Sequence, residues 1–154
     1  MKKLLLGCWL AALIGSTAGA NLSRISVAGN HFVTADGKPI VFHGLDASDP
    51  DKLQRNGVWD TNYFAAIKSW GANIVRLPVH PAAWHLRGQP GYLKLLDEGV
   101  AMAKAQGLYV IIDWHSIGNL HEGKFQPGAS ELYPVALYDT TPAETLDFLS
   151  LIHI

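Results

Sequence analysis

Three short apolar segments, at 40–42, 73–78 and 108–115, begin 33 and 35 residues apart, with helix-like segments between them. The third segment is apolar on both faces until its last residues, which is typical of a parallel strand covered on both sides. Strands that alternate with helices predict a parallel sheet with right-handed crossovers. A hairpin is predicted before them at 25–33, where two β-prone runs flank a Gly-Asn turn. The periodicity alone leaves an open sheet and a closed barrel as alternatives.

The segments around these strands carry helix signals. Asp60 or Thr61 can cap a helix after the first strand, and a second helix is predicted over 93–107. Residues 116–139 hold glycine, proline and polar residues without periodicity, and we expect them to form a loop. The sequence Thr-Pro-Ala-Glu at 141–144 is a capping box with proline at the first helical position, so another helix is predicted to begin there.

The first twenty residues have the layout of a secretory signal peptide. A positive start, an apolar run at 4–14 and a small-residue triplet at 18–20 predict cleavage after Ala20. We therefore expect a leader at 1–20 and one domain over 21–154, located in the periplasm or outside the cell. The single cysteine lies in this leader, so the exported chain is expected to contain no disulfide.

Charge and composition narrow the classes of function. A chain that is 49% hydrophobic and 16% charged fits one globular core. Its formal net charge is -1, and loss of the two leader lysines, from 12 to 10 basic residues against 13 acidic ones, makes it about -3. No basic field is present to attract nucleic acid or acidic lipid. No glycine-rich phosphate loop follows the first strand, which counts against a nucleotide-binding Rossmann domain.

Chemically active side chains stand at the ends of the predicted strands. In α/β folds functional groups gather at the carboxyl ends of strands, and here those ends carry Arg76, His80, Asp113 and His115. Because strand side chains alternate, Asp113 and His115 share one face, and Trp114 is expected to point away from them into the core. Arginine and histidine are costly at buried strand ends unless paired or used. From the residues alone, a structural ion pair between Arg76 and Asp113 and a functional site are equal alternatives.

The sequences at 71–78 (Gly-Ala-Asn-Ile-Val-Arg-Leu-Pro) and 110–115 (Val-Ile-Ile-Asp-Trp-His) resemble glycoside hydrolase family 5, the cellulase family of (β/α)8-barrel enzymes. The resemblance runs from about residue 25 to residue 148. It implies a partial TIM (β/α)8 barrel, about the first three β/α units, with the hairpin plugging the barrel bottom. It also implies a retaining endo-β-1,4-glucanase that acts on a β-linked polysaccharide or oligosaccharide, is monomeric in the full-length parent, and uses no cofactor or metal.

The resemblance further implies roles for single residues. Arg76 matches the active-site arginine of the second strand, which orders the nucleophilic carboxylate by a charge-assisted hydrogen bond. His115 matches the histidine that closes the third strand in the sugar cleft. His80 falls where family members place a side chain against the glycone sugar. Trp84, in the following loop, is expected to be a stacking platform, with an exposed packing tryptophan as an equal alternative. Asp46 stands after the first strand, where many members have asparagine, and is the third substrate-binding candidate.

The sequence has no counterpart of the family's catalytic pair. Retaining glycosidases need two carboxyl groups ~5–5.5 Å apart, and in this family they are glutamates at the ends of strands four and seven, the first one preceded by asparagine. No Asn-Glu pair occurs, and the glutamates present are Glu98, Glu122, Glu131 and Glu144. The apolar tail at 148–154 contains no helix stop. We therefore expect a truncated and inactive N-terminal part of a barrel enzyme.

Two other functions remain open at this point. A metal-dependent barrel hydrolase is suggested by seven histidines, but no His-x-His or His-Glu-x-x-His pattern occurs. A non-catalytic carbohydrate-binding fragment is suggested by the aromatic-rich loops. Cellulose-type β-1,4-glucan is the default substrate, because the Asp-Trp-His ending of the third strand resembles the cellulase branch of the family.

Overall fold

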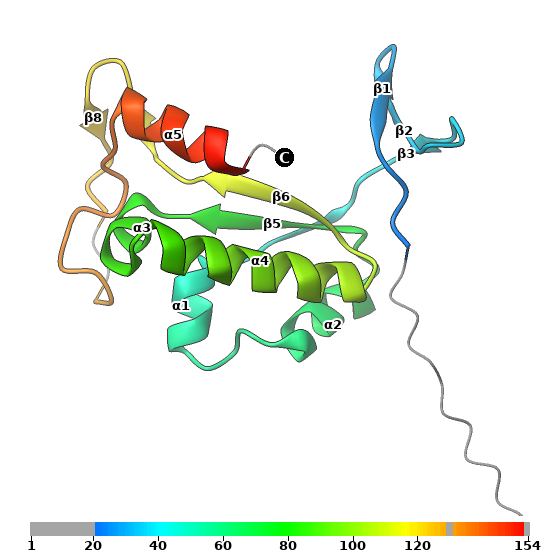
Figure 1. Cartoon of the computed structure of the whole chain (residues 1–154), viewed down its shortest axis with the longest axis horizontal. Helices are drawn as coiled ribbons and strands as arrows, with labels where there is room; N and C mark the ends of the chain where they lie inside the picture. Colours follow the sequence, from blue (N-terminus) through cyan, green and yellow to red (C-terminus); the bar gives the residue numbers. More distant parts are fainter. Residues whose placement is uncertain (1–20, 129–130, 153–154) are drawn as a thin grey trace, which may run out of the picture.

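The structure, a computed structural model, describes residues 21–128 and 131–152, so the expected leader at 1–20 lies outside the described residues. Its centre is a parallel sheet in the order β4–β5–β6 (Figure 1). The three strands are Gly44–Asp46, Ile74–Val79 and Tyr109–Trp114. The second and third predicted core strands are therefore confirmed, and so is their parallel pairing.

An antiparallel unit precedes the parallel sheet and lies beyond the amino ends of β5 and β6 (Figure 1). It consists of β1 (Ser26–Ala28), β2 (His31–Val33) and β3 (Pro39–Ile40). β1 and β2 form the hairpin predicted at 25–33. The unit contacts the sheet through aromatic rings, since Phe42 packs edge-on against Phe32 and Tyr109.

The prediction that the first core strand spans 40–42 is wrong. Ile40 pairs with β2 in the antiparallel unit, and the first parallel strand begins four residues later, at Gly44. The connecting residues are fixed by Asn73, whose side-chain amide accepts from the backbone N–H of His43 and donates to the carbonyl of Val41. At Gly44 a Cβ atom would overlap the carbonyl of Ile74, so only glycine permits this close approach of β4 to β5.

Five helices complete the described chain: α1 (Pro50–Arg55), α2 (Thr61–Ser69), α3 (Pro81–Arg87), α4 (Gln89–Ala105) and α5 (Pro142–Ile152). Asp60, one of the two capping residues predicted for this helix, caps α2 by accepting from the backbone N–H of Tyr63. α4 begins four residues before the predicted 93–107 segment. α1 and α3 were not predicted, because six or seven residues are too few to show a helical period.

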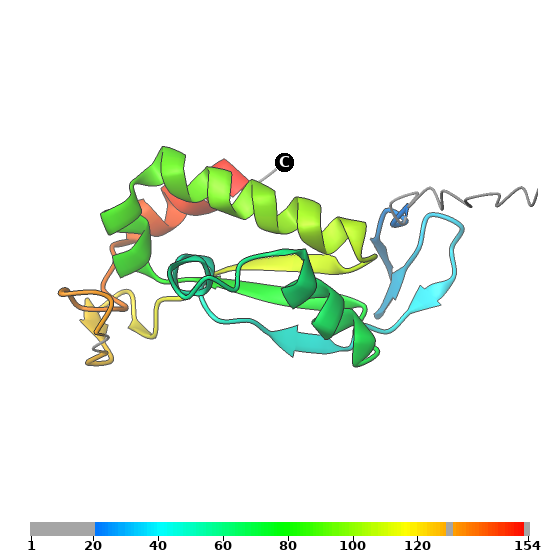
Figure 2. The same cartoon turned by 90° about the horizontal axis from the view of Figure 1, so that it is seen from below.

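The core forms on the side of the sheet that the helices cover. Figure 2 shows α4 and α5 together on one side of the strands, with β4 farthest from them. One cluster gathers α2, α4 and the strands around Phe64, Val75 and Leu77, all with no exposed surface. A second cluster gathers α3, α4 and α5 around Tyr92 and Phe148. The alternate residues of β5 and β6 face away from these helices and carry the candidate site.

The described residues of the segment at 116–139 are mostly irregular, as predicted, and include a two-stranded ladder of β7 (Gly118–Asn119) and β8 (Lys124–Phe125). Helix α5 begins with proline, and the backbone N–H of Glu144 donates to the hydroxyl of Thr141. Only this half of the predicted capping box forms, because the Glu144 carboxylate contacts Thr140 and His85 instead. Among the described residues, no helix has the length and apolarity needed to cross a membrane.

Candidate active site

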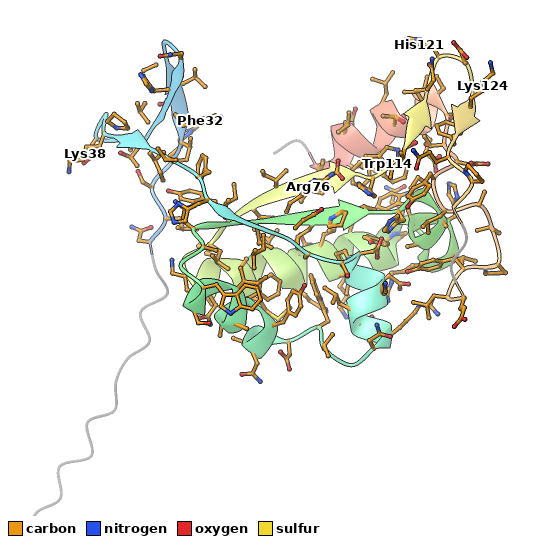
Figure 3. The ribbon with its side chains drawn as sticks, turned by 180° about the vertical axis from the view of Figure 1, so that it is seen from behind. Phe32, Lys38, Arg76, Trp114, His121 and Lys124 are labelled. Atoms are coloured by element: carbon orange, nitrogen blue, oxygen red, sulfur yellow. The ribbon has the colours of Figure 1, made fainter. Side chains whose placement is uncertain are left out.

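An arginine on the middle strand of the parallel sheet lies between two carboxylates that stand near the carboxyl ends of the neighbouring strands. The register pairs Asp46 on β4 with Arg76 on β5, and Asp113 follows two positions further along on β6. Arg76 donates from Nη1 to Asp46 at 2.8 Å and from Nη2 to Asp113 at 2.5 Å. The ion pair between Arg76 and Asp113 is therefore present. The arginine side chain is still 35% exposed, so it can contact a ligand as well (Figure 3).

We call the side of the sheet that carries Asp46, Arg76 and Asp113 the inner face. An open groove of about 620 Å³ follows it from Asp46 and Arg76 toward Phe32 and Phe42 of the N-terminal segment. Figure 3 looks onto this region, with Arg76 at the middle of the sheet and Phe32 at one end. The charged side chains that line the groove are those of Asp46 and Arg76, and a polar ligand would find hydrogen-bond partners there.

His115 extends this polar group by one residue beyond β6. Its Nδ1 lies 2.7 Å from the carboxylate of Asp113 and 3.2 Å from Nη2 of Arg76. A carboxylate can only accept and a guanidinium can only donate. The shorter contact therefore assigns the proton to Nδ1, which donates to Asp113. As predicted, Asp113 and His115 lie on one face, and Trp114 lies in the core on the other.

His80, four residues after Arg76, lies beside His115. The two imidazole rings are edge-to-face with centroids 5.1 Å apart, and the Tyr138 ring contacts both. His80 is the residue before α3, and its side chain is 16% exposed. The structure thus brings together four of the five candidate residues, counting Asp46 with Arg76, His80 and His115.

The fifth candidate, Trp84, is placed differently from the prediction. It lies in α3 rather than in a loop, and only 8% of it is exposed. Its ring packs edge-on against Trp114 and Phe148, with centroids 6.0 and 5.1 Å away. A stacking platform needs a free ring face. The structure instead places the Trp84 ring in the packing between α3, β6 and α5.

Two buried carboxylates behind His80 were missed in the sequence. Asp49 and Asp51 are 1% and 0% exposed. Asp49 accepts from Tyr92, and Asp51 accepts from Tyr133, in contacts of 2.7 and 2.9 Å. Burial, followed by the nearby charge of Asp49, raises the pKa of both tyrosines well above the ordinary value. Both tyrosines therefore stay protonated and serve as hydrogen-bond donors. A run of polar residues between a strand and a helix gives no sequence signal for such burial.

Asp51 also holds two arginines. Arg55 and Arg87 donate to it at 2.6 and 2.8 Å. Burial raises the pKa of Asp51, but the hydrogen bonds from Arg55, Arg87 and Tyr133 lower it by more, so the net direction is downward. Asp51 is thus a structural anion that ties α1 to α3 and to the irregular segment before α5.

The four glutamates lie away from the inner face. Glu98 is exposed on α4, Glu122 pairs with Lys124 at the β7–β8 tip, and Glu131 is exposed in the irregular segment. Glu144 on α5 contacts Thr140 and His85. Figure 3 shows Lys124 well apart from Arg76. Within the part of the chain that the structure describes, no group of three or more histidine, cysteine or acidic side chains is arranged to hold a metal ion.

Comparison with known proteins matches most of the chain to one family. The model of the cellulase family, glycosyl hydrolase family 5, matches residues 33–138. Endoglucanase A of Butyrivibrio fibrisolvens is 28% identical over 123 residues, which are 71% of this chain and 27% of the relative. Endoglucanase C of Evansella cellulosilytica is 33% identical over 121 residues, 75% of this chain and 14% of the relative. The chain thus spans between about one seventh and one quarter of the length of these relatives.

A solved structure also matches. The native β-glucanase SdGluc5_26A of Saccharophagus degradans superposes with a TM-score of 0.73 at 40% sequence identity, over 82% of this chain and 36% of that protein. The same enzyme in complex with cellotetraose matches equally well. The three β/α units and the preceding hairpin are therefore the counterpart of part of a barrel, and the described strands do not close into a barrel themselves.

Proposed function

The chain belongs to glycosyl hydrolase family 5, the cellulase family, and from that membership we propose that it forms part of the substrate-binding face of a retaining endo-β-1,4-glucanase. The observation that carries this proposal is Arg76, held between Asp46 and Asp113 and still partly exposed on the inner face. In the whole enzyme its guanidinium would order the nucleophilic carboxylate by a charge-assisted hydrogen bond. The cellotetraose complex of the similar β-glucanase supports a β-glucan as the substrate class.

The neighbours of Arg76 are assigned to sugar binding. His115 and His80 present their rings side by side, each held by a carboxylate through Nδ1. Asp46 is 56% exposed beside Arg76 and can accept from a sugar hydroxyl. Hydroxyl recognition needs such fixed donors and acceptors at the edge of an apolar groove. Trp84 has no part in this assignment because its ring is covered.

Hydrolysis requires two carboxyl groups that this chain does not supply in suitable places. A retaining pair needs a separation of ~5–5.5 Å across the scissile bond. Asp46 and Asp113 share one guanidinium, and both are engaged as its counter-ions. The four glutamates of the described residues lie on the helices or the irregular segment. We assign both catalytic glutamates to the portion of the parent enzyme beyond this chain, and the chain alone is expected to be inactive.

Export is part of the same proposal. The leader at 1–20 would direct the protein to the periplasm or the medium, where a polymeric glucan can be reached, and it would be removed after Ala20. The intact mass of the protein recovered from the exported fraction tests this directly. A mass that still includes residues 1–20 in that fraction would contradict cleavage.

Binding and hydrolysis are tested separately on the chain. Calorimetric titration with cellotetraose is expected to show weak binding, and His115→Ala and His80→Ala should each weaken it about tenfold, the value of one lost hydrogen bond of about 1.4 kcal/mol. His43→Ala is the matched control, because His43 is an exposed histidine before β4 and away from the other two. Reducing-sugar release from carboxymethyl-cellulose is expected to be absent.

The outcomes separate the two parts of the proposal. No heat of binding with cellotetraose, or equal weakening by His43→Ala, would refute a sugar-binding inner face. Measurable sugar release that Arg76→Ala abolishes would refute the inactivity of the chain and keep the family assignment intact.

A further inference from the structure

We propose that Asp49 is a positioning residue for His80: it holds the imidazole in the Nδ1–H form, so that Nε2 is a fixed acceptor for a substrate hydroxyl. The identity of the ligand in this inference rests on the proposed function, whereas the tautomer of the His80 imidazole does not. It concerns a residue 31 positions away from His80 in the sequence, in the segment between β4 and α1.

Asp49 meets His80 at two points. One carboxylate oxygen, Oδ2, accepts from the backbone N–H of His80 at 2.8 Å and lies 3.0 Å from Nδ1 of the same residue. A single oxygen therefore fixes both the backbone and the ring of His80. This fixes the orientation of the ring. Rotation about the χ angles of His80 would break the contact of Nδ1 with Oδ2, although the backbone contact would persist.

The other oxygen of Asp49 is equally occupied. Oδ1 accepts from the backbone N–H of Asp51 and from the hydroxyl of Tyr92, both at 2.7 Å. Burial raises the pKa of Tyr92, so that its hydroxyl keeps its proton as a donor. The carboxylate is 1% exposed, and so water does not compete for its lone pairs. Asp49 is held from α1, α4 and the end of β5 at once.

The donors around Asp49 decide the tautomer of His80. Both carboxylate oxygens already accept from backbone N–H groups, which can only donate. An ionised Asp49 can then make its fourth contact only if Nδ1 of His80 carries a proton. In a neutral imidazole the second nitrogen, Nε2, is then an acceptor. Within residues 21–128 and 131–152, no hydrogen-bond partner of this Nε2 is found, and the ring lies against His115 and Tyr138.

His115 has the same arrangement on the neighbouring strand, because its Nδ1 contacts the carboxylate of Asp113. Two imidazoles 5.1 Å apart are thus each held through Nδ1 by an acid. Among the described residues, neither Nε2 has a hydrogen-bond partner. A pair of acceptors with fixed geometry suits a ligand that offers two hydroxyl donors, and a carbohydrate has this chemistry.

The experiment reads the tautomer directly. The full chain is labelled with nitrogen-15 and studied by magic-angle-spinning NMR, whose line widths do not depend on oligomeric state, with His80→Gln to assign the signal. In the unmodified chain at neutral pH, we expect His80 to show a protonated Nδ1 and an unprotonated Nε2. In Asp49→Asn the amide oxygen is expected to stay on the backbone N–H of Asp51, which turns the NH2 group toward Nδ1 of His80. His80 should then shift toward the Nε2–H form, and the contact with its own backbone N–H is lost. Asp49→Ser, too short to reach the ring, is expected to give an averaged imidazole.

The controls separate positioning from folding. Asn and Ser both retain N-cap function at α1, so the two variants keep the helix start. Asp60→Asn is the matched control, since Asp60 caps α2 in the same way and its carboxylate accepts from Tyr63 rather than from a histidine. It should leave the His80 signal unchanged.

Each outcome decides the proposal. An Nε2–H or averaged His80 in the unmodified chain would overturn it, whether or not the variants fold. An unchanged His80 signal in both Asp49→Asn and Asp49→Ser would also overturn it. If the expected tautomer is found and cellotetraose leaves the Nε2 signals of His80 and His115 in place, the sugar-binding proposal fails while the role of Asp49 stands.

Discussion

Asp51, two residues after the positioning residue Asp49, makes the stability of the chain depend on pH. Its pKa is lower in the folded chain than the ordinary 3.8, since the donors from Arg55, Arg87 and Tyr133 outweigh burial. A carboxyl whose pKa is lowered by folding stabilises the fold above its unfolded pKa, and this is lost as pH falls through the folded pKa. We therefore expect the urea midpoint to be level between about pH 7 and 5 and to fall below about pH 4.

The variant Asp51→Asn tests the origin of that slope. It leaves two guanidinium groups without their anion, one of them 45% exposed and thus partly solvated. We expect the free energy of unfolding at neutral pH to fall by about 2–4 kcal/mol. We also expect this free energy to change less as the pH is lowered. Urea unfolding followed by tryptophan fluorescence at pH 7 and 3 measures both. Asp97→Asn, an exposed carboxylate on α4, should change stability by less than about 0.5 kcal/mol. An acid slope that survives Asp51→Asn would contradict the assignment.

At the scale of elements, the sequence predicts what depends on local pattern. β5 and β6 are largely apolar runs, and α2 and α5 have capping residues, so these elements can be predicted from the sequence. The start of β4 cannot be predicted in this way, because it depends on the side chain of Asn73, thirty residues away from His43. The candidate residues Arg76, His80 and His115 could be predicted, because each lies in or just after a recognisable apolar strand. Asp49 does not, because its partners His80 and Tyr92 are 31 and 43 residues distant and only the fold brings them together.

Helix α4 contains a glycine whose role is visible only in the packing. A Cβ atom on Gly99 would lie 2.5 and 2.7 Å from two ring carbons of Trp59. Alanine is the better helix former by about 1 kcal/mol, but the ring would have to move out of a filled core. We expect Gly99→Ala to lower the free energy of unfolding by about 1–3 kcal/mol, because overpacking outweighs helix propensity. Urea unfolding measures the change.

Gly91, in the first turn of the same helix, is the matched control. A Cβ atom there meets only carbons of the Arg87 side chain, at 3.1 and 3.8 Å. Gly91→Ala is expected to stay within about 1 kcal/mol of the unmodified chain, since the gain in propensity and a small shift of Arg87 oppose each other. Equal effects of the two substitutions would show that Trp59 does not set the requirement at Gly99.

At the scale of the whole molecule, the described chain has a sheet with two open edges. β4 and β6 each pair with β5 alone. The groove on the inner face exposes Ile111 at 47% and Phe32 at 50%, and Trp70 beside the β4 edge is 77% exposed. Unpaired strand edges next to apolar surface favour association with other chains. The antiparallel unit covers only the amino ends of β5 and β6, so it leaves these edges free (Figure 1).

We therefore expect the chain to self-associate as its concentration rises, with the inner face and the strand edges as the contact. Ile111→Lys places a charge in the middle of the groove and should weaken association at least tenfold in sedimentation-velocity experiments, because a buried unpaired charge costs several kcal/mol. Leu86→Lys is the control: Leu86 is 48% exposed on α3, outside the groove. Circular dichroism checks that both variants keep their helices. Equal weakening by both would point to general charge repulsion, and no weakening by Ile111→Lys would place the contact elsewhere than on the inner face.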